Sequence, residues 1–125
     1  MSDPTGAKRR CTCPGATVWV TGPSVADRRA AAYALAERLR ADQRRVAVLD
    51  RPGGLDPDVE RTGLMAEVLA RNGIVAIAPC APESPPAVCA RHKASGTRYV
   101  EVCVTGHDRP TDVAAEAHAL LGRHS

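Results

Sequence analysis

The stretch that most constrains this chain runs from Gly15 to Arg29 and reads GATVWVTGPSVADRR. Its first part, residues 16–21, is an apolar run typical of a buried strand; Gly22 then opens a loop, and Asp27 begins an alanine-rich helical segment. A strand, a glycine-opened loop and a helix in this order form the frame of a phosphate-binding P-loop, G-x-x-x-x-G-K-[ST]. The sequence therefore predicts an α/β domain with such a frame at its first turn.

The residues that would do the chemistry of this frame are replaced. Asp27 takes the place of the second glycine, Arg28 that of the lysine and Arg29 that of the Ser/Thr. These changes place a carboxylate where a phosphate would bind and replace the compact ammonium group of a lysine by a planar guanidinium. They also remove the hydroxyl that would hold Mg²⁺. We interpret the segment as a degenerate P-loop composed of Gly22, Ser24, Asp27, Arg28 and Arg29. Ser24 and Asp27 are expected to cap a helix that begins near Arg28.

Strands and helices alternate along the rest of the chain. This order predicts a parallel sheet of about four strands with helices on both faces, a three-layer α/β sandwich. Ligands of such sheets bind at the carboxyl ends of the strands, here residues 21–29, 50–52, 79–82 and 105–109. The further strands are expected at 46–49, 74–78 and 98–104, and the helices at 28–41, 59–71, 87–94 and from Thr111 to near Leu121.

Helical spacing also predicts which side chains face the core. In the helix 28–41, Ala31, Leu35 and Leu39 recur at the spacing of one buried face. In the helix 59–71, the large apolar residues Leu64, Val68 and Leu69 are expected to point inward by the same argument.

Composition restricts the class of protein. The chain has 125 residues, a net charge of +3 and 44% hydrophobic residues, which suits one globular domain at 15–125 behind a polar, flexible tail at 1–14. Only 2% of residues are aromatic and the arginines are scattered, so a nucleic-acid surface is not indicated. No apolar run is long enough to span a membrane and no signal peptide is evident, so we expect a cytoplasmic protein.

The five cysteines do not form a metal-binding pattern. Cys11 and Cys13 form a C-x-C in the tail without a second ligand pair, so no zinc site is predicted and their role stays open. Cys80, Cys89 and Cys103 fall on predicted strands and helices, and we expect them to be buried thiols.

Several segments resemble one enzyme family. GATVWVTG, YALAERLRA, RRVAVLD, RTGLMAEVLARNGIVAIAP and ARHKASGTRYVEVCV are similar to segments of adenylylsulfate (APS) kinases, and the similarity covers about residues 15–122. The resemblance implies a P-loop kinase-like fold. It also implies a reaction in which the γ-phosphate of MgATP moves to the 3′-hydroxyl of APS, giving 3′-phosphoadenylylsulfate (PAPS).

The chain departs from that family at its working parts. GPSVADRRA stands where the family has a sequence like GLPSAGKTT, and Asp50-Arg51-Pro52 stands for Asp-Gly-Asp. In the family motif Asn-x-x-Arg, Asp58 replaces the asparagine and Arg61 keeps the arginine. After the last strand, the long lid of the family is missing, and residues 105–110 lead directly to the final helix.

These losses predict a catalytically degenerate APS kinase homologue with no catalytic residues, no metal site and no ATP or Mg²⁺ requirement, because phosphoryl transfer needs the lysine, the metal ligand and the lid together. Asp50 and Arg61 are the remaining candidates for an APS or anion site, the alternative for them being a local ion pair. His92 and His107 lack a ligand pattern and are expected at the surface or in packing roles.

Three functions stay open from the sequence. The first is an interaction or regulatory protein in sulfate activation or a sulfation pathway. The second is a residual APS kinase that uses ATP and Mg²⁺ with Arg28 in place of the lysine, and the third is a module that binds APS or PAPS weakly without turnover. Loss of the lid and of an edge strand would leave the strand from Tyr99 to Val104 unprotected. We therefore expect a homodimer or a complex with another protein through that edge.

Overall fold

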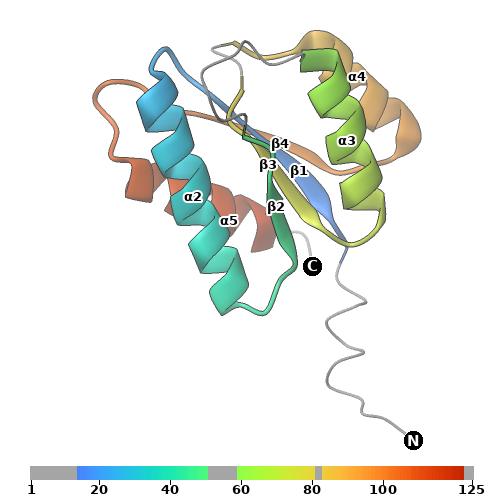
Figure 1. Ribbon diagram of the computed structural model, residues 1–125, viewed down its shortest axis with the longest axis horizontal. Helices are drawn as coiled ribbons and strands as arrows, with labels where there is room; N and C mark the ends of the chain where they lie inside the picture. Colours follow the sequence, from blue (N-terminus) through green and yellow to red (C-terminus); the bar gives the residue numbers. More distant parts are fainter. Residues whose placement is uncertain (1–13, 51–58, 81–82, 123–125) are drawn as a thin grey trace, which may run out of the picture.

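The computed structural model describes residues 14–50, 59–80 and 83–122. Over these residues, strands and helices alternate as the sequence predicts (Figure 1). Cys11, Cys13, the greater part of the predicted tail and the predicted turn residues Arg51 and Asp58 lie outside the described residues. The elements are β1 (Ala16–Thr21), α2 (Val25–Ala41), β2 (Val46–Val48), α3 (Val59–Arg71), β3 (Val75–Ala78), α4 (Pro86–Ser95), β4 (Tyr99–Cys103) and α5 (Pro110–Gly122).

The four strands form one parallel sheet in the order β2-β3-β1-β4. The central strand β1 is buried along its whole length, and it pairs with β3 from Ala16 opposite Val75 and with β4 from Thr17 opposite Tyr99. Helices α2 and α5 cover one face, and α3 and α4 cover the other (Figure 1). The predicted α/β architecture is therefore confirmed, and β4 lies at an edge of the sheet.

The core has two parts because alternate side chains of β1 point to opposite faces. On the side of α2 and α5, Val18 and Val20 pack in a cluster that includes the predicted Ala31, Leu35 and Leu39. On the side of α3 and α4, Trp19 packs with Ala78 and Val88 in a smaller cluster.

Two predicted helix starts are wrong. Helix α2 begins at Val25, three residues before Arg28, because Ser24 occupies the N-cap position and its Oγ atom accepts the Asp27 N–H at 3.2 Å. Asp27 thus lies in the first turn and is not the cap residue. Helix α5 begins at Pro110, so Thr111 lies inside it and does not cap it. Proline is well suited to a first helical position since it has no N–H to satisfy.

The predicted inner face of α3 is wrong for Leu64 and Val68, whereas the third predicted residue, Leu69, is half-buried. Leu64 and Val68 are 44% and 59% exposed, whereas the buried residues of this helix are Gly63, Ala66, Glu67 and Ala70. The close approach of α3 to α4 is the reason. A Cβ atom at Gly63 would lie 2.6 Å from the Cγ2 atom of Val88, so the helices are too close there for any residue larger than glycine.

Candidate functional site

The segment predicted as a degenerate P-loop, residues 22–29, lies between β1 and α2 and in the first turns of α2, where a parallel sheet of this type binds its ligands. Gly22 has a φ of +136°, and a Cβ atom there would lie 2.1 Å from the carbonyl oxygen of Val104, so only glycine fits. The loop itself spans only residues 22–24 before α2 begins.

The short loop changes what the backbone offers to an anion. In a P-loop, successive backbone N–H groups point toward the phosphates. Here the Asp27 N–H binds the hydroxyl of Ser24, and the Arg28 N–H donates to the Ser24 carbonyl at 3.0 Å. Both donors are therefore used inside the first turn of the helix.

Arg28, at the position of the P-loop lysine, is directed into the protein. Its side chain is buried, with the whole residue 6% exposed. The Nη1 atom donates to the carbonyl oxygen of Gly22 at 2.5 Å, and the Nε atom donates to the carbonyl oxygen of Pro79 at 3.4 Å. The guanidinium thus lies between the carboxyl ends of β1 and β3, next to the place where the family pattern would put a phosphate.

Arg29 lies at the position of the Mg²⁺-binding hydroxyl and forms an ion pair instead. Its Nε atom is 2.8 Å from the Oδ2 atom of Asp50, which also accepts the Tyr33 hydroxyl at 3.1 Å. Asp50 therefore contacts side chains of α2, on one face of the sheet. Arg61, the other candidate for an anion site, is exposed near the start of α3, which covers the opposite face.

The thiol of Cys80 follows β3 and is close enough to Arg28 to sense its charge. Burial raises the pKa of Cys80 to about 11, and the hydrogen bond with Thr62 and the positive charge of Arg28 oppose this rise only in part. The thiol is therefore protonated at neutral pH, which does not suit a nucleophile.

The connection after β4 is a turn whose residues are hydrogen-bonded to one another. The Asp108 carboxylate accepts both the backbone N–H of Thr105, at 3.0 Å, and its hydroxyl, at 2.9 Å. These two hydrogen bonds hold the pKa of Asp108 below its ordinary value. His107 lies in the same exposed turn. The segment that stands where the family has its lid is thus a tight turn with its own internal partners.

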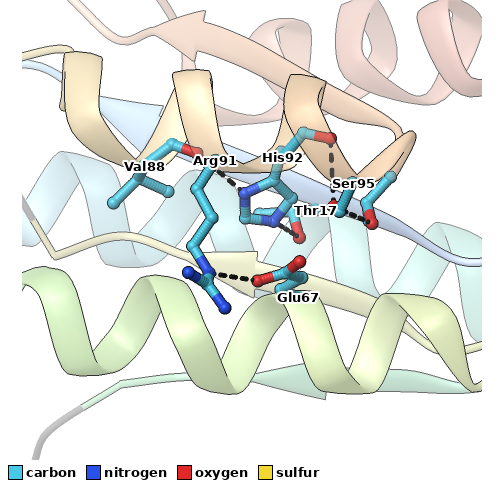
Figure 2. Close-up of polar contacts among 7 residues, drawn as sticks. Thr17, Glu67, Val88, Arg91, His92 and Ser95 are labelled. Atoms are coloured by element: carbon cyan, nitrogen blue, oxygen red, sulfur yellow. Dashed lines mark hydrogen bonds and ion pairs between the residues drawn. The ribbon is translucent and has the colours of Figure 1, made fainter.

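A polar cluster under α4 was not recognised in the sequence (Figure 2). His92 is fully buried; its Nδ1 atom donates to the Val88 carbonyl at 2.9 Å, and its Nε2 atom is hydrogen-bonded to the Thr17 hydroxyl at 2.8 Å. Beside it, the buried Glu67 forms an ion pair of 2.6 Å with Arg91. The predicted packing role of His92 is confirmed. The ion pair could have been expected from the sequence only through Glu67, because this charged residue shares a helix face with Gly63, Ala66 and Ala70.

Of the three described cysteines, Cys80 and Cys89 are partly buried. Cys103 is exposed on the edge strand, so its predicted burial is wrong. Across residues 14–50, 59–80 and 83–122, no cluster of three or more His, Cys, Asp or Glu residues is placed to hold a metal ion. None of the helices described in this structure is long and apolar enough to cross a membrane.

No protein-family model and no curated protein matches the chain. Solved structures do. The APS kinase of Mycobacterium tuberculosis superimposes with a TM-score of 0.69 at 22% identity over 88% of this chain and 99% of that one. The same enzyme in complex with AMPPNP and APS gives 0.69 at 17% identity, with the same coverage.

A hexameric APS kinase from Thiobacillus denitrificans matches 98% of this chain with a TM-score of 0.67 and 27% identity. This chain spans about a third, 33%, of the length of that protein. The agreement extends over nearly all described elements and includes the parallel sheet with helices on both faces. The chain therefore has a P-loop kinase fold of the kind found in APS kinases.

Proposed function

We propose that this protein is a non-catalytic relative of the APS kinases, with an interaction or regulatory role in sulfate activation or in a sulfation pathway. The burial of Arg28 carries the proposal. Its guanidinium donates to the carbonyl oxygens of Gly22 and Pro79, so the cation that would neutralise a phosphate is held by the protein backbone.

The surroundings of Arg28 point the same way. A triphosphate entering this loop would have to displace the guanidinium from a buried position, and it would meet the Asp27 carboxylate in the first turn. Two backbone N–H groups of that turn are already hydrogen-bonded to Ser24. Displacing the buried guanidinium of Arg28 costs about 1–3 kcal/mol for each carbonyl oxygen left without a partner.

The metal requirement is expected to be lost as well. Arg29 carries no oxygen ligand for Mg²⁺, and Asp50, the first residue of the former Asp-Gly-Asp segment, is engaged by Arg29 and Tyr33. We propose that the protein functions without ATP or Mg²⁺. Weak binding of APS or PAPS at Asp50 or at Arg61, which lie on opposite faces of the sheet, is the second candidate function.

Titration of the purified protein tests the proposal. Calorimetry and thermal unfolding with MgATP, ADP, APS and PAPS, each up to millimolar concentration, should give no heat and no rise of the midpoint for MgATP and ADP, because a ligand that binds the native state raises its stability. Binding of APS or PAPS without formation of product would favour the binding module. Micromolar MgATP binding with PAPS formation would instead identify a residual kinase and contradict the proposal.

We further propose that β4 is the contact surface for another chain. Backbone groups of residues 98 and 104 bond to β1, so by the alternation of a parallel ladder the groups of Tyr99, Glu101 and Cys103 face outward at the edge. Unpaired N–H and C=O groups in an extended row are a template for strand addition. A hexameric neighbour supports assembly of this fold in general.

A further inference from the structure

Helix α3 carries its hydrophobic residues on the outside. Leu64, Met65 and Val68 are 44%, 51% and 59% exposed, and they account for three of the five large exposed hydrophobic residues among the described residues. The buried side of the same helix consists mainly of glycine and alanine. Large apolar groups on a solvent-facing helix stripe contribute nothing to the core of the single chain and favour contact with another surface.

The single chain has no room to turn this stripe inward. Besides the contact of Gly63 with Val88, a Cβ atom at Gly15 would lie 2.3 Å from the carbonyl oxygen of Ala70. Helix α3 is thus held at close range on two sides by groups that only glycine accommodates. Leu64, Met65 and Val68 are therefore fixed facing solvent in the monomer.

A hollow lies beside the stripe. It has a volume of about 300 Å³ and is lined by residues of α3 and α4. Leu64 and Val88 give it apolar walls, and Arg91, fixed by its ion pair with Glu67, borders it. Its remaining lining residues are Glu60, Gly63 and Ala87. A branched apolar side chain from outside would fit a hollow of this kind.

The charges at the two ends of α3 select the orientation of a partner. Glu60 and Arg71 are spaced four residues before Leu64 and three residues after Val68, so at helical spacing all four lie on one side of the helix. If two such helices pack antiparallel, Glu60 of each copy approaches Arg71 of the other. If they pack parallel, like charges meet at both ends, which is unfavourable.

We propose that α3 is a dimerisation helix, which packs antiparallel across a two-fold axis against α3 of a second copy. Leu64 and Val68 of each copy contact the stripe and the hollow of the other, with Met65 at the border. A two-fold contact requires a self-complementary surface, and a stripe with opposite charges at its two ends has this property. The proposal is independent of nucleotide binding and of the β4 edge.

Sedimentation equilibrium of the full chain at micromolar concentrations tests it. The wild type should have about twice the mass of the 13.2 kDa chain. Val68→Asp and Leu64→Asp should each raise the dissociation constant by about a hundredfold or more, because each places two charges in the centre of an apolar contact. Val25→Asp is the matched control, since Val25 is 58% exposed but lies on α2, and its dimer should persist.

Charge exchange tests the antiparallel arrangement separately. Glu60→Arg alone and Arg71→Glu alone should each weaken the dimer at neutral pH and low salt, since each brings like charges together twice. The double variant E60R/R71E should restore it. An equimolar mixture of the two single variants should form heterodimers, because all charges across that interface are then opposite.

The proposal is overturned by a wild type that stays monomeric at every concentration up to about a millimolar, well above the range of a specific dimer. It is equally overturned by a dimer that survives Val68→Asp and Leu64→Asp, or by one lost on Glu101→Pro at the β4 edge. Far-ultraviolet circular dichroism of each variant verifies that the fold is intact, which is expected because the substituted side chains are exposed.

Discussion

The Nη1 atom of Arg28 lies 2.5 Å from the carbonyl oxygen of Gly22, six residues earlier in the chain. This hydrogen bond joins the two positions at which a P-loop would begin and would carry its lysine. Since the guanidinium is buried and also reaches Pro79, it joins the carboxyl ends of β1 and β3 through their backbone carbonyl oxygens.

Removing this side chain should open the site to anions. Arg28→Ala is expected to lower the free energy of unfolding by about 1–3 kcal/mol, because two backbone carbonyls lose a charged donor. In return, millimolar phosphate or ADP should raise the unfolding midpoint of the variant and not that of the wild type.

The control is Arg29→Ala, which removes the same charge one residue further on from an exposed ion pair. It should lower the free energy of unfolding less than Arg28→Ala does, and it should not create phosphate sensitivity. If phosphate stabilises the wild type as much as Arg28→Ala, the guanidinium does not block the site.

Gly22 should not tolerate a side chain. Gly22→Ala is expected to destabilise the protein by about 3 kcal/mol or more, because an alanine there combines a positive φ with a clash against the Val104 carbonyl. Chemical denaturation measures the difference. Gly106→Ala, where no atom lies within 4 Å of the added group, should change stability by about 0.5 kcal/mol at most.

The ion pair of Glu67 should make stability depend on pH. Ser95 and Arg91 hold the pKa of Glu67 below its ordinary value of 4.5, so the unfolded state takes up a proton more readily than the folded state. The contribution of Glu67 is then complete above the unfolded pKa and is lost as the pH falls through the folded pKa.

Denaturation between pH 7 and pH 3 measures this slope. Glu67→Gln should be less stable than the wild type at pH 7, by about 1–3 kcal/mol, and the gap should narrow toward pH 3. Glu37→Gln, on the exposed side of α2, should follow the wild-type curve. A constant gap across the pH range would contradict the assigned role of the carboxylate.

Proline substitutions at two neighbouring positions of β4 should differ in how much they destabilise the protein. Val100→Pro removes a backbone donor that faces β1 and should cost about 3 kcal/mol or more, whereas Glu101→Pro removes one that faces outward and should be far milder. If β4 binds another chain by strand addition, Glu101→Pro should abolish that binding while Glu101→Ala retains it. Pull-down from cell extract with both variants as bait, followed by identification of proteins lost only with the proline, tests this.

The sequence predicted the layers and strand positions well because they depend on local patterns. Each local pattern was compatible with one structure. The apolar run from Ala16 to Thr21 forms the buried strand that it predicts, and the helical spacing of Ala31, Leu35 and Leu39 places all three in the core. Helix starts were less predictable. The cap role predicted for Ser24 is confirmed, but the motif frame placed the start near Arg28, whereas the helix begins at Val25, directly after Ser24.

The two largest discrepancies are tertiary. Periodicity places Leu64 and Val68 inward, and only the position of Val88 on a different helix makes glycine necessary at the inner face. The burial of Arg28 likewise depends on the carbonyl oxygen of Pro79, 51 residues away in the chain. Neither distance is available from a local sequence pattern.

The strand order has a consequence for synthesis of the chain. Strand β1, which is buried along its whole length, pairs with β3 and β4, and Ala16 meets its partner Val75 only after two helices and another strand have been made. A nascent chain therefore carries β1 without its partner strands until β3 has been synthesised, and an unpaired strand of this kind is a segment that chaperones protect during translation.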